Sequence, residues 1–298
     1  MSPLFELREV SHTYPDGSIG LDGCSMQIAR GSRNALLGAN GSGKTTLMQH
    51  LNGLLKPGGG SIHFDGSPID TSRRGLHALR CRVGFVFQNP DRQLFSASVR
   101  EDVSFGPLNL DLDEATVRHR VDEALRAVGM LEQAARPLHH LSFGQKKRVC
   151  LAGVLAMQPD VLVLDEPNAG LDAAMRDELM SLLDDLAARG ITILLSTHDV
   201  DFAYRWADQI HLMSGGRCSS SFPVTQLPTQ RDALQAAGQR LPEVVQLHGA
   251  LVACGLVAAG APPRCVSELP AMLTARLSAT GTAINQGTAD AAPSRSGA

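Results

Sequence analysis

The chain has 298 residues, with 27 Lys and Arg against 30 Asp and Glu, and its formal charge of −3 does not indicate the basic surface of a nucleic-acid-binding protein. Hydrophobic residues make up 43% of the chain and charged residues 19%, which is typical of globular proteins and excludes disorder throughout. The length suggests one large domain, or one domain with a small appendage.

Three patterns bear on where such a protein works. The longest weakly polar stretch, residues 249–261, is shorter than the ~20 apolar residues of a membrane helix. The first ten residues alternate like a strand and carry Glu6, Arg8 and Glu9 where a secretion signal has an apolar core. The six cysteines are far apart and include no C-x-x-C pair, which predicts neither disulfides nor zinc. We expect a protein of the reducing cytoplasm that does not itself span a membrane.

The first 216 residues follow an alternating pattern. Short apolar or β-branched runs alternate with amphipathic stretches, and Gly and Pro stand at the junctions, which predicts an α/β domain. A strand is expected within residues 1–10. A second short strand, Ala35–Leu37, precedes a predicted helix at Thr45–Leu51.

A β-α-β unit is predicted later in the chain. Val161–Leu164 and Ile191–Leu195 are continuous apolar runs too short for helices, which indicates strands buried on both faces. Between them, Leu and Met recur at spacings of three and four from Leu171 to Leu186, and Gly190 ends this predicted helix.

Beyond residue 216 the composition shifts to Ala, Gly, Pro, Gln and Ser. Leu241–Cys254 and Val266–Leu277 predict two helices, each near a Pro that suits a first helical turn. From Thr282 onward little can be buried, which predicts a flexible tail.

Residues 38–45 read Gly-Ala-Asn-Gly-Ser-Gly-Lys-Thr and fit the phosphate-loop pattern G-x-x-x-x-G-K-[ST]. The glycines allow successive N–H groups to surround phosphates at a helix N-terminus. Lys44 could then reach the β- and γ-phosphates, and the Thr45 hydroxyl could bind Mg²⁺. The alternative, a glycine-rich turn, is disfavoured because a strand precedes the pattern and a helix follows it.

Two consecutive carboxylates, Asp165 and Glu166, end the predicted strand at Val161–Leu164, at the sheet edge where α/β proteins bind ligands. Asp165 could hold Mg²⁺ through water, and Glu166 could orient or deprotonate an attacking water. His198 ends the next strand and is expected at the same edge, close to a γ-phosphate. A solvated strand end and a structural histidine are the alternatives.

These residues resemble the ATP-binding subunit of ABC transporters, and the likeness covers residues 4 to about 218. Leu141-Ser142-Phe143-Gly144-Gln145 resembles the family's signature segment and is followed by basic residues. The resemblance implies that Ser142 and the Gly144 backbone bind the γ-phosphate of ATP held by a second protomer, in a head-to-tail dimer. It assigns nucleotide contacts to Tyr14, Gly38, Asn40, Gly41, Ser42, Gly43, Lys44, Thr45, Thr46, Ser142, Gly144, Gln145 and Asp172.

The assignments of Tyr14, Gln88 and Asp172 rest on order and spacing within the family pattern. Tyr14 resembles the aromatic residue that stacks on adenine. Gln88 resembles the glutamine that senses Mg²⁺ and links to the membrane subunit, and Asp172 resembles the aspartate of the dimer-facing loop. The alternatives are a core tyrosine, a polar strand end and a helix N-cap. The implied catalytic residues are Glu166, His198, Lys44 and Gln88, and the implied Mg²⁺ ligands are Thr45, Gln88 and Asp165.

Phe143 departs from the family pattern, which usually has Gly at the third signature position. A positive φ would strain Phe by about 1–3 kcal/mol, so we predict a negative φ there. The departure raises the alternative of a non-catalytic regulatory module, against which the intact Lys44, Asp165, Glu166 and His198 argue.

Within the family, residues 83–95 and 101–107 resemble the ATPases of energy-coupling-factor importers, most of all the cobalt or nickel importer ATPase. Residues 145–159 and 241–277 resemble the same branch, whose C-terminal helices help two ATPases associate. The resemblance implies ATP and Mg²⁺, transmembrane energy-coupling and substrate-binding partners, and a place on the cytoplasmic face of a bacterial membrane. It implies no nucleic-acid partner and no direct contact with cargo.

The predicted fold class is therefore α/β: a P-loop ABC ATPase with a RecA-like core, an antiparallel β subdomain, a helical signature subdomain and a small C-terminal helical appendage. The expected segments are residues 1–218, 219–281 and 282–298. The alternatives are a vitamin-specific importer of the same type, a soluble ABC ATPase and a P-loop small-molecule kinase. A soluble ABC ATPase usually has a coiled-coil arm or two nucleotide domains, and residues 88–142 are too few for such an arm. The signature segment disfavours the kinase.

Overall fold

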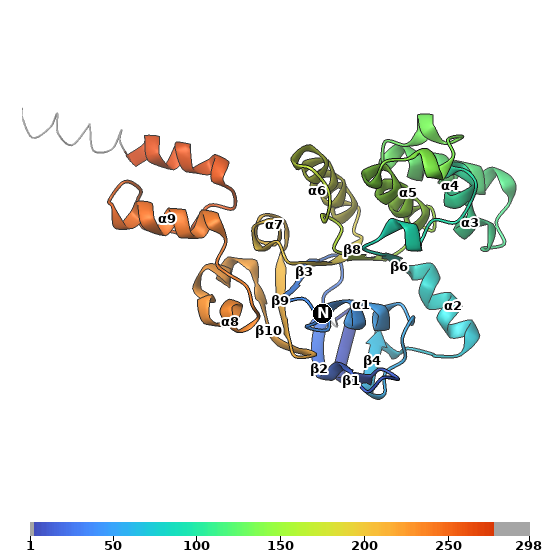
Figure 1. Ribbon diagram of the computed structural model, residues 1–298, viewed down its shortest axis with the longest axis horizontal. Coiled ribbons are helices and arrows are strands. Elements are labelled where there is room, and N and C mark those ends of the chain that lie inside the picture. The colour runs from blue at the N-terminus through green and yellow to red at the C-terminus, as the bar shows by residue number, and fades with distance from the viewer. Residues whose placement is uncertain (1–2, 277–298) are drawn as a thin grey trace, which may run out of the picture.

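A six-stranded sheet forms the centre of the computed structural model, which describes residues 3–276 (Figure 1). Its strand order is β10-β9-β3-β8-β7-β6, and all neighbours are parallel except β9 and β10. The strands are β3 (Arg33–Gly38), β6 (Val83–Val86), β7 (Val161–Asp165), β8 (Thr192–Thr197), β9 (Gln209–Ser214) and β10 (Arg217–Pro223). The predicted strands at residues 35–37, 161–164 and 191–195 are confirmed as β3, β7 and β8.

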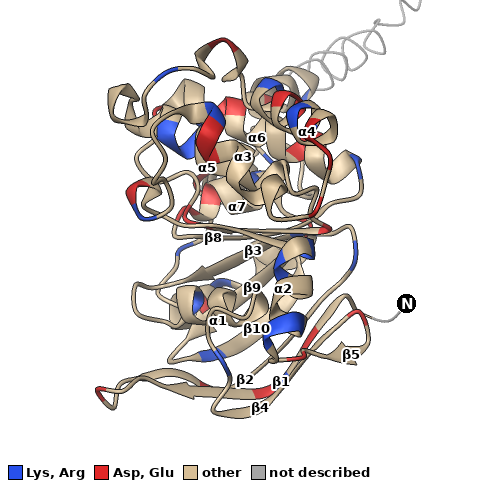
Figure 2. Ribbon diagram, turned by 90° about the vertical axis from the view of Figure 1, so that its right-hand side faces the viewer, with Lys and Arg blue, Asp and Glu red and all other residues tan. Residues whose placement is uncertain are grey.

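Each face of this sheet is covered by a separate layer (Figure 2). One layer consists of helices α3 (Val99–Leu108), α4 (Glu114–Ala127), α5 (Phe143–Leu155), α6 (Ala173–Ala188) and α7 (Val200–Trp206). The other contains α1 (Lys44–Leu51), α2 (Arg73–Arg82) and an antiparallel sheet of β1 (Phe5–Thr13), β2 (Ile19–Ile28), β4 (Gly59–Phe64) and β5 (Ser67–Pro68). Helices α1 and α6 and strand β1 confirm the predicted elements at those positions.

The continuous apolar run of β7 follows from these two layers. Leu162 and Leu164 belong to the core under the α3–α7 helices, whereas Val161 and Val163 belong to the core shared with α1 and the antiparallel sheet. Because side chains alternate along a strand, a strand covered on both faces needs apolar residues at every position.

The C-terminal part continues from the central sheet. The predicted boundary at residue 218 falls inside β10, which is followed by a 3₁₀ helix (Val224–Thr229), α8 (Arg231–Ala236) and α9 (Glu243–Ala253). Helix α9 confirms the predicted helix at Leu241–Cys254. The second predicted helix begins as a 3₁₀ turn at Val266–Glu268 and is helical to residue 276, the last one described. The predicted tail, residues 282–298, lies outside the described residues.

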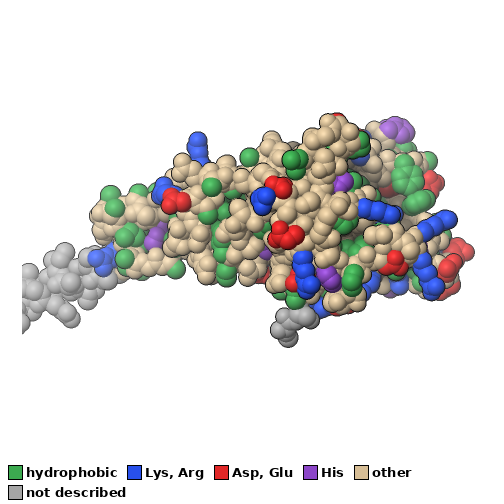
Figure 3. Space-filling model, turned by 90° about the horizontal axis from the view of Figure 1, so that it is seen from below, with side chains coloured by type: hydrophobic (Ala, Val, Ile, Leu, Met, Phe, Trp, Pro, Cys, Tyr) green, Lys and Arg blue, Asp and Glu red, His purple; other side chains and the backbone are tan. Residues whose placement is uncertain are grey.

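Charged side chains of both signs are interspersed on the face shown in Figure 3. Within residues 3–276, no helix combines the length and the apolar character that crossing a bilayer requires.

A buried histidine in β9 makes the stability of the fold depend on pH. His211 Nδ1 lies 2.8 Å from Ser221 Oγ, and its Nε2 lies 3.2 Å from Asn34 Oδ1. Burial lowers the pKa of His211 to about 4. The folded state therefore excludes a proton that the unfolded chain binds below pH 6.5. The contribution of His211 to the free energy of unfolding is fully present above pH 6.5 and is lost as the pH falls toward 4.

We predict that the free energy of unfolding falls by about 1.4 kcal/mol per pH unit between pH 6.5 and 4 because of His211 alone. Urea titrations at several pH values measure this slope. The His211→Gln variant keeps hydrogen-bonding groups but cannot titrate, so its slope should be smaller by that amount. Equal slopes in the two chains would contradict the assignment.

Candidate nucleotide-binding site

The phosphate loop joins β3 to α1 and has the backbone that its glycines predict. Gly43 has a φ of 101°, and a Cβ there would lie 2.6 Å from the Gly20 carbonyl oxygen, so only glycine fits. Lys44 Nζ donates to the carbonyl oxygens of Gly38 and Ala39 at 2.8 and 3.0 Å. Burial lowers the pKa of Lys44, against the opposing attraction of Glu166 and Asp165. The lysine is thus held inside the loop.

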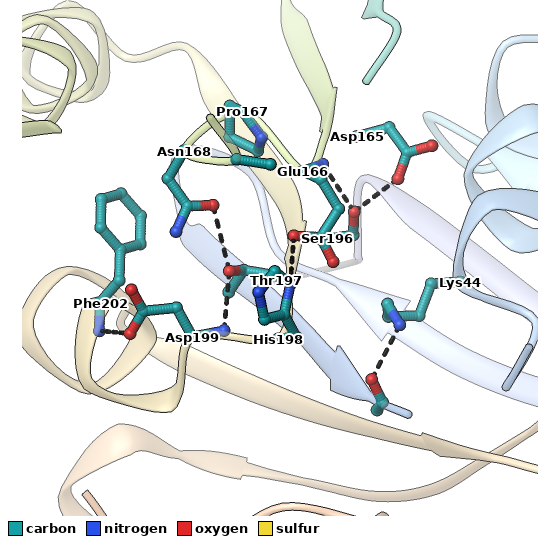
Figure 4. Close-up of polar contacts among 12 residues, drawn as sticks. Lys44, Asp165, Glu166, Pro167, Asn168, Ser196, Thr197, His198, Asp199 and Phe202 are labelled. Carbon is teal, nitrogen blue, oxygen red and sulfur yellow. Dashed lines mark hydrogen bonds and ion pairs between the residues drawn. The ribbon is translucent and has the colours of Figure 1, made fainter. Parts of the chain in front are cut away.

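Asp165, at the end of β7, joins two other elements of the site. Its Oδ2 accepts a hydrogen bond from Thr45 Oγ1 at 2.9 Å, although the two residues are 120 positions apart. Its Oδ1 accepts one from Ser196 Oγ, at the end of β8, at 2.6 Å (Figure 4). Hydroxyl and carboxylate oxygens are the ligands that Mg²⁺ prefers, so this donor set fits that ion.

Glu166 and His198 meet at the edge of the central sheet, as predicted. His198 Nδ1 lies 2.9 Å from Glu166 Oε2, and the Glu166 N–H donates to Ser196 Oγ at 2.9 Å (Figure 4). The Glu166 side chain is only 9% exposed, whereas that of His198 is 63% exposed. The carboxylate is therefore fixed, and the imidazole can still reach a ligand.

One cavity of about 440 Å³ brings most of the predicted residues together. Its lining includes residues from the phosphate loop, both sheets and the strand ends: Tyr14, Ser18, Ile19, Gly20, Asn40, Gly41, Gly43, Lys44, Thr45, Thr46, Gln88, Asp165, Glu166 and His198. Tyr14 directly follows β1, and its hydroxyl oxygen lies 2.8 Å from Thr46 Oγ1. Gly38 and Ser42 belong to the same loop but do not line the cavity.

The signature residues do not line this cavity. Ser142 is exposed and is the N-cap of α5, where its Oγ accepts from the Gln145 N–H while its own N–H donates to Gln145 Oε1. This reciprocal pair is the capping box of an S-x-x-Q sequence. Gly144 lies in the first turn of α5, and Asp172 is the N-cap of α6. The four residues Ser142, Gly144, Gln145 and Asp172 are thus not part of the lining of the nucleotide cavity of their own chain.

Phe143 has the negative φ that we predicted. It is the first residue of α5 and is absent from the non-glycine residues with positive φ in the described part of the chain. Its ring packs on Gly170, where a Cβ would come within 3.0 Å of it, and Lys147 Nζ lies 5.2 Å from the ring centroid. The replacement of Gly by Phe therefore costs no backbone strain.

Sequence reasoning missed two residues of this region. Ser196 is a polar residue near the end of β8, the strand next to β7, and this position is a signal that could have identified it. Lys147 is buried beside Glu166, and nothing in the helical pattern of α5 distinguishes it from the basic residues on either side.

Comparisons with known proteins agree with this geometry. Residues 21–169 match the family model described as ABC transporter. The chain is 44% identical to the energy-coupling factor transporter ATP-binding protein EcfA of Methanothermobacter thermautotrophicus, over 85% of this chain and 81% of that one.

Two solved structures are also similar. CbiO1 of Clostridium perfringens, part of the ABC transporter complex CbiONQ, is 45% identical with a TM-score of 0.72, over 84% of this chain and 100% of that one. A dimeric ATP-binding cassette in a post-hydrolysis state, bound to ADP and Pi, is 27% identical with a TM-score of 0.68, over 74% of this chain and 98% of that one. The chain therefore belongs to the ABC transporter ATP-binding proteins of the energy-coupling-factor type, which are ATPases.

Proposed function

We propose that two copies of this chain bind two ATP molecules at a shared face, close, hydrolyse them and reopen, and that this cycle drives the import of cobalt or nickel ions. The observation that carries the proposal is the division of the site. The phosphate loop, Glu166 and His198 share one cavity, whereas Ser142 is exposed outside it. One chain therefore holds only half of each complete site. The similar ATP-binding cassette described above, which is a dimer bound to ADP and Pi, supports the proposal that two copies share the site.

In each half-site the side chains have separate roles. Lys44 binds the β- and γ-phosphates in place of its carbonyl partners, and Tyr14 stacks on adenine. Glu166 orients the attacking water and accepts its proton while the water oxygen bonds to the γ-phosphorus. The bond from that phosphorus to the β–γ bridging oxygen breaks, and ADP leaves. The Nδ1–H of His198 donates to the Glu166 carboxylate, which orients the ring so that its other edge contacts the γ-phosphate.

Thr45, Asp165 and Gln88 are the residues that would hold Mg²⁺. The ion, when bound, neutralises the repulsion between the triphosphate and the two carboxylates. The 2.9 Å bond between Thr45 Oγ1 and Asp165 Oδ2 places two of these oxygen ligands together before any ion binds.

Closure of the dimer follows from differential affinity. Ser142 and the Gly144 backbone of the second copy, with Gln145 and Asp172 beside them, contact the nucleotide only in the closed form, so ATP favours that form. The C-terminal helices help the two copies associate. Leu247, Leu256 and Val266 there are 44–55% exposed, which leaves apolar surface for a second copy.

A transmembrane energy-coupling subunit docks beside Gln88, on the segment that leads to Phe95. Phe95, Phe105 and Leu108 are 66%, 54% and 64% exposed, and the two phenylalanine rings meet edge to face with centroids 4.8 Å apart. Large apolar side chains that gather on a surface mark an interaction site. Because Gln88 lines the nucleotide cavity, this position connects the docking surface to ATP.

We predict that Phe95→Ser combined with Phe105→Ser abolishes copurification with the membrane subunit and leaves the ATPase activity of the isolated chain within about twofold, because neither ring lines the nucleotide cavity. Pull-down from detergent extract measures the complex. Leu54→Ser removes an exposed apolar side chain that lies elsewhere and does not line the nucleotide cavity, so it should leave the complex intact. Equal recovery of the doubly substituted chain would place the docking surface elsewhere.

The cargo assignment rests on the likeness to CbiO1 of the complex CbiONQ. Cargo would reach a separate substrate-binding membrane subunit, so this chain touches no cargo and no nucleic acid and works at the cytoplasmic face of the membrane. When the chain is coexpressed with energy-coupling and substrate-binding membrane subunits from its own genome, it should drive ATP-dependent uptake of radioactive Co²⁺ or Ni²⁺. Uptake of a vitamin instead would select the vitamin-specific importer, and failure to form any membrane complex would select a soluble ABC ATPase.

A further inference from the structure

The turn that carries Glu166 has an unfavourable backbone. Glu166 has a φ of 47°, in the left-handed region that non-glycine residues rarely adopt, and it is followed by Pro167. Such a conformation persists only where surrounding contacts hold it. In this chain, Ser196 and Lys147 bond to the peptide units on the two sides of Glu166.

Ser196 holds the N-terminal side of this residue. The Glu166 N–H donates to Ser196 Oγ at 2.9 Å, and that hydroxyl in turn donates to Asp165 (Figure 4). The bond fixes the peptide unit between Asp165 and Glu166 but does not constrain the one that follows.

Lys147, from α5, holds the C-terminal side. Its Nζ donates to the carbonyl oxygens of Glu166, Pro167 and Ala169 at 3.2, 3.0 and 2.6 Å, and the residue is 8% exposed. An ammonium group has three protons, so these bonds satisfy it completely. Charge-assisted bonds inside a protein are strong, and three converging carbonyls define the path of the turn.

We propose that Lys147 is a positioning residue for ATP hydrolysis, because its bonds to the carbonyls of Glu166, Pro167 and Ala169 fix the left-handed turn that presents the Glu166 carboxylate to the nucleotide. The proposal rests on the role given above to Glu166. Lys147 does not line the nucleotide cavity and acts only through this turn.

The same side chain connects the two halves of the composite site. Lys147 lies in α5, one turn beyond Phe143, whose ring covers Nζ and packs on Gly170. Helix α5 presents Ser142 to the ATP of the second copy, and the turn presents Glu166 to the ATP of its own chain. A displacement of α5 on dimer closure is therefore transmitted to Glu166. Burial lowers the pKa of Lys147 to about 8, so the three-proton form still prevails at pH 7.

The test replaces the ammonium group and keeps the aliphatic stem. We expect K147M to lower kcat for ATP hydrolysis by about 10- to 100-fold while the Kd for ATP changes less than about threefold, because the phosphate loop is untouched. K147R keeps a charged donor and should recover most of kcat. Hydrogen exchange of a peptide covering residues 165–171 should rise in K147M and remain near wild type in K147R.

The matched control is Lys56→Met, which removes an exposed lysine outside the site and should change neither kcat nor exchange. A K147M chain with wild-type kcat would overturn the proposal, and so would equal losses of kcat in K147M and K147R. If K147M does not fold, K147Q replaces it, and the expected order of kcat is wild type, K147R, then K147Q. Full turnover by E166Q would remove the role of Glu166 itself, whereas an inactive E166Q beside an active K147M would refute only the inference about Lys147.

Discussion

The Glu166→Gln chain is expected to bind ATP about as well as wild type and to hydrolyse it at least about 100-fold more slowly, because an amide cannot accept the proton of the attacking water. The amide keeps the size of the side chain and can still bond His198, so the cavity keeps its shape. With hydrolysis blocked, ATP should hold two chains in the closed form. Single-turnover hydrolysis and size-exclusion chromatography with ATP measure the two effects.

Asp185→Asn provides the control for this experiment, because Asp185 is an exposed carboxylate of α6 outside the cavity. It should hydrolyse ATP at the wild-type rate and elute as wild type does. Sustained multiple turnover by the Glu166→Gln chain would show that another group accepts the proton, and the most direct candidate would be His198.

The Lys44→Ala chain is expected to bind ATP about 10- to 100-fold more weakly and to lose measurable turnover. Lys44 is the only Lys or Arg among the residues that line the cavity within the described part of the chain. Its removal therefore leaves the triphosphate facing Asp165 and Glu166 without an opposing side-chain cation. Calorimetric titration with ATP and Mg²⁺ measures the loss. Lys56→Ala should bind normally, and unchanged binding by Lys44→Ala would remove the phosphate loop from its assigned role.

Local patterns were sufficient for the parts of the site that lie at strand ends. The phosphate loop, Asp165, Glu166 and His198 follow short apolar runs, and parallel strands bring their carboxyl ends to one sheet edge. The capped starts of α5 and α6 also follow from local sequence, because Ser142 and Asp172 bond to residues three positions ahead.

The remaining features depend on contacts between distant segments, which no local pattern records. Lys147 reaches the Glu166 turn because the packing of α5 brings it next to the residues that follow β7. Similarly, the Ala39 N–H of the phosphate loop donates to the Ala237 carbonyl oxygen at 3.1 Å. Ala237 follows α8 and is nearly 200 positions away in the sequence. The direction of α8 and the left-handed turn at Glu166 therefore depend on tertiary contacts, which form only when the chain folds.

The central claim is that each ATP is held between the phosphate loop of one copy and Ser142 of the other, and complementation between two inactive chains tests it most directly. Lys44→Ala removes one half of the site. Ser142→Asp removes the other, because it sets a carboxylate against the γ-phosphate while still capping α5. Each chain alone should be inactive, and mixing them should restore ATP hydrolysis, since a mixed dimer has one site with both Lys44 and Ser142. A mixture that remains inactive, although cross-linking shows that mixed dimers form, would contradict the claim.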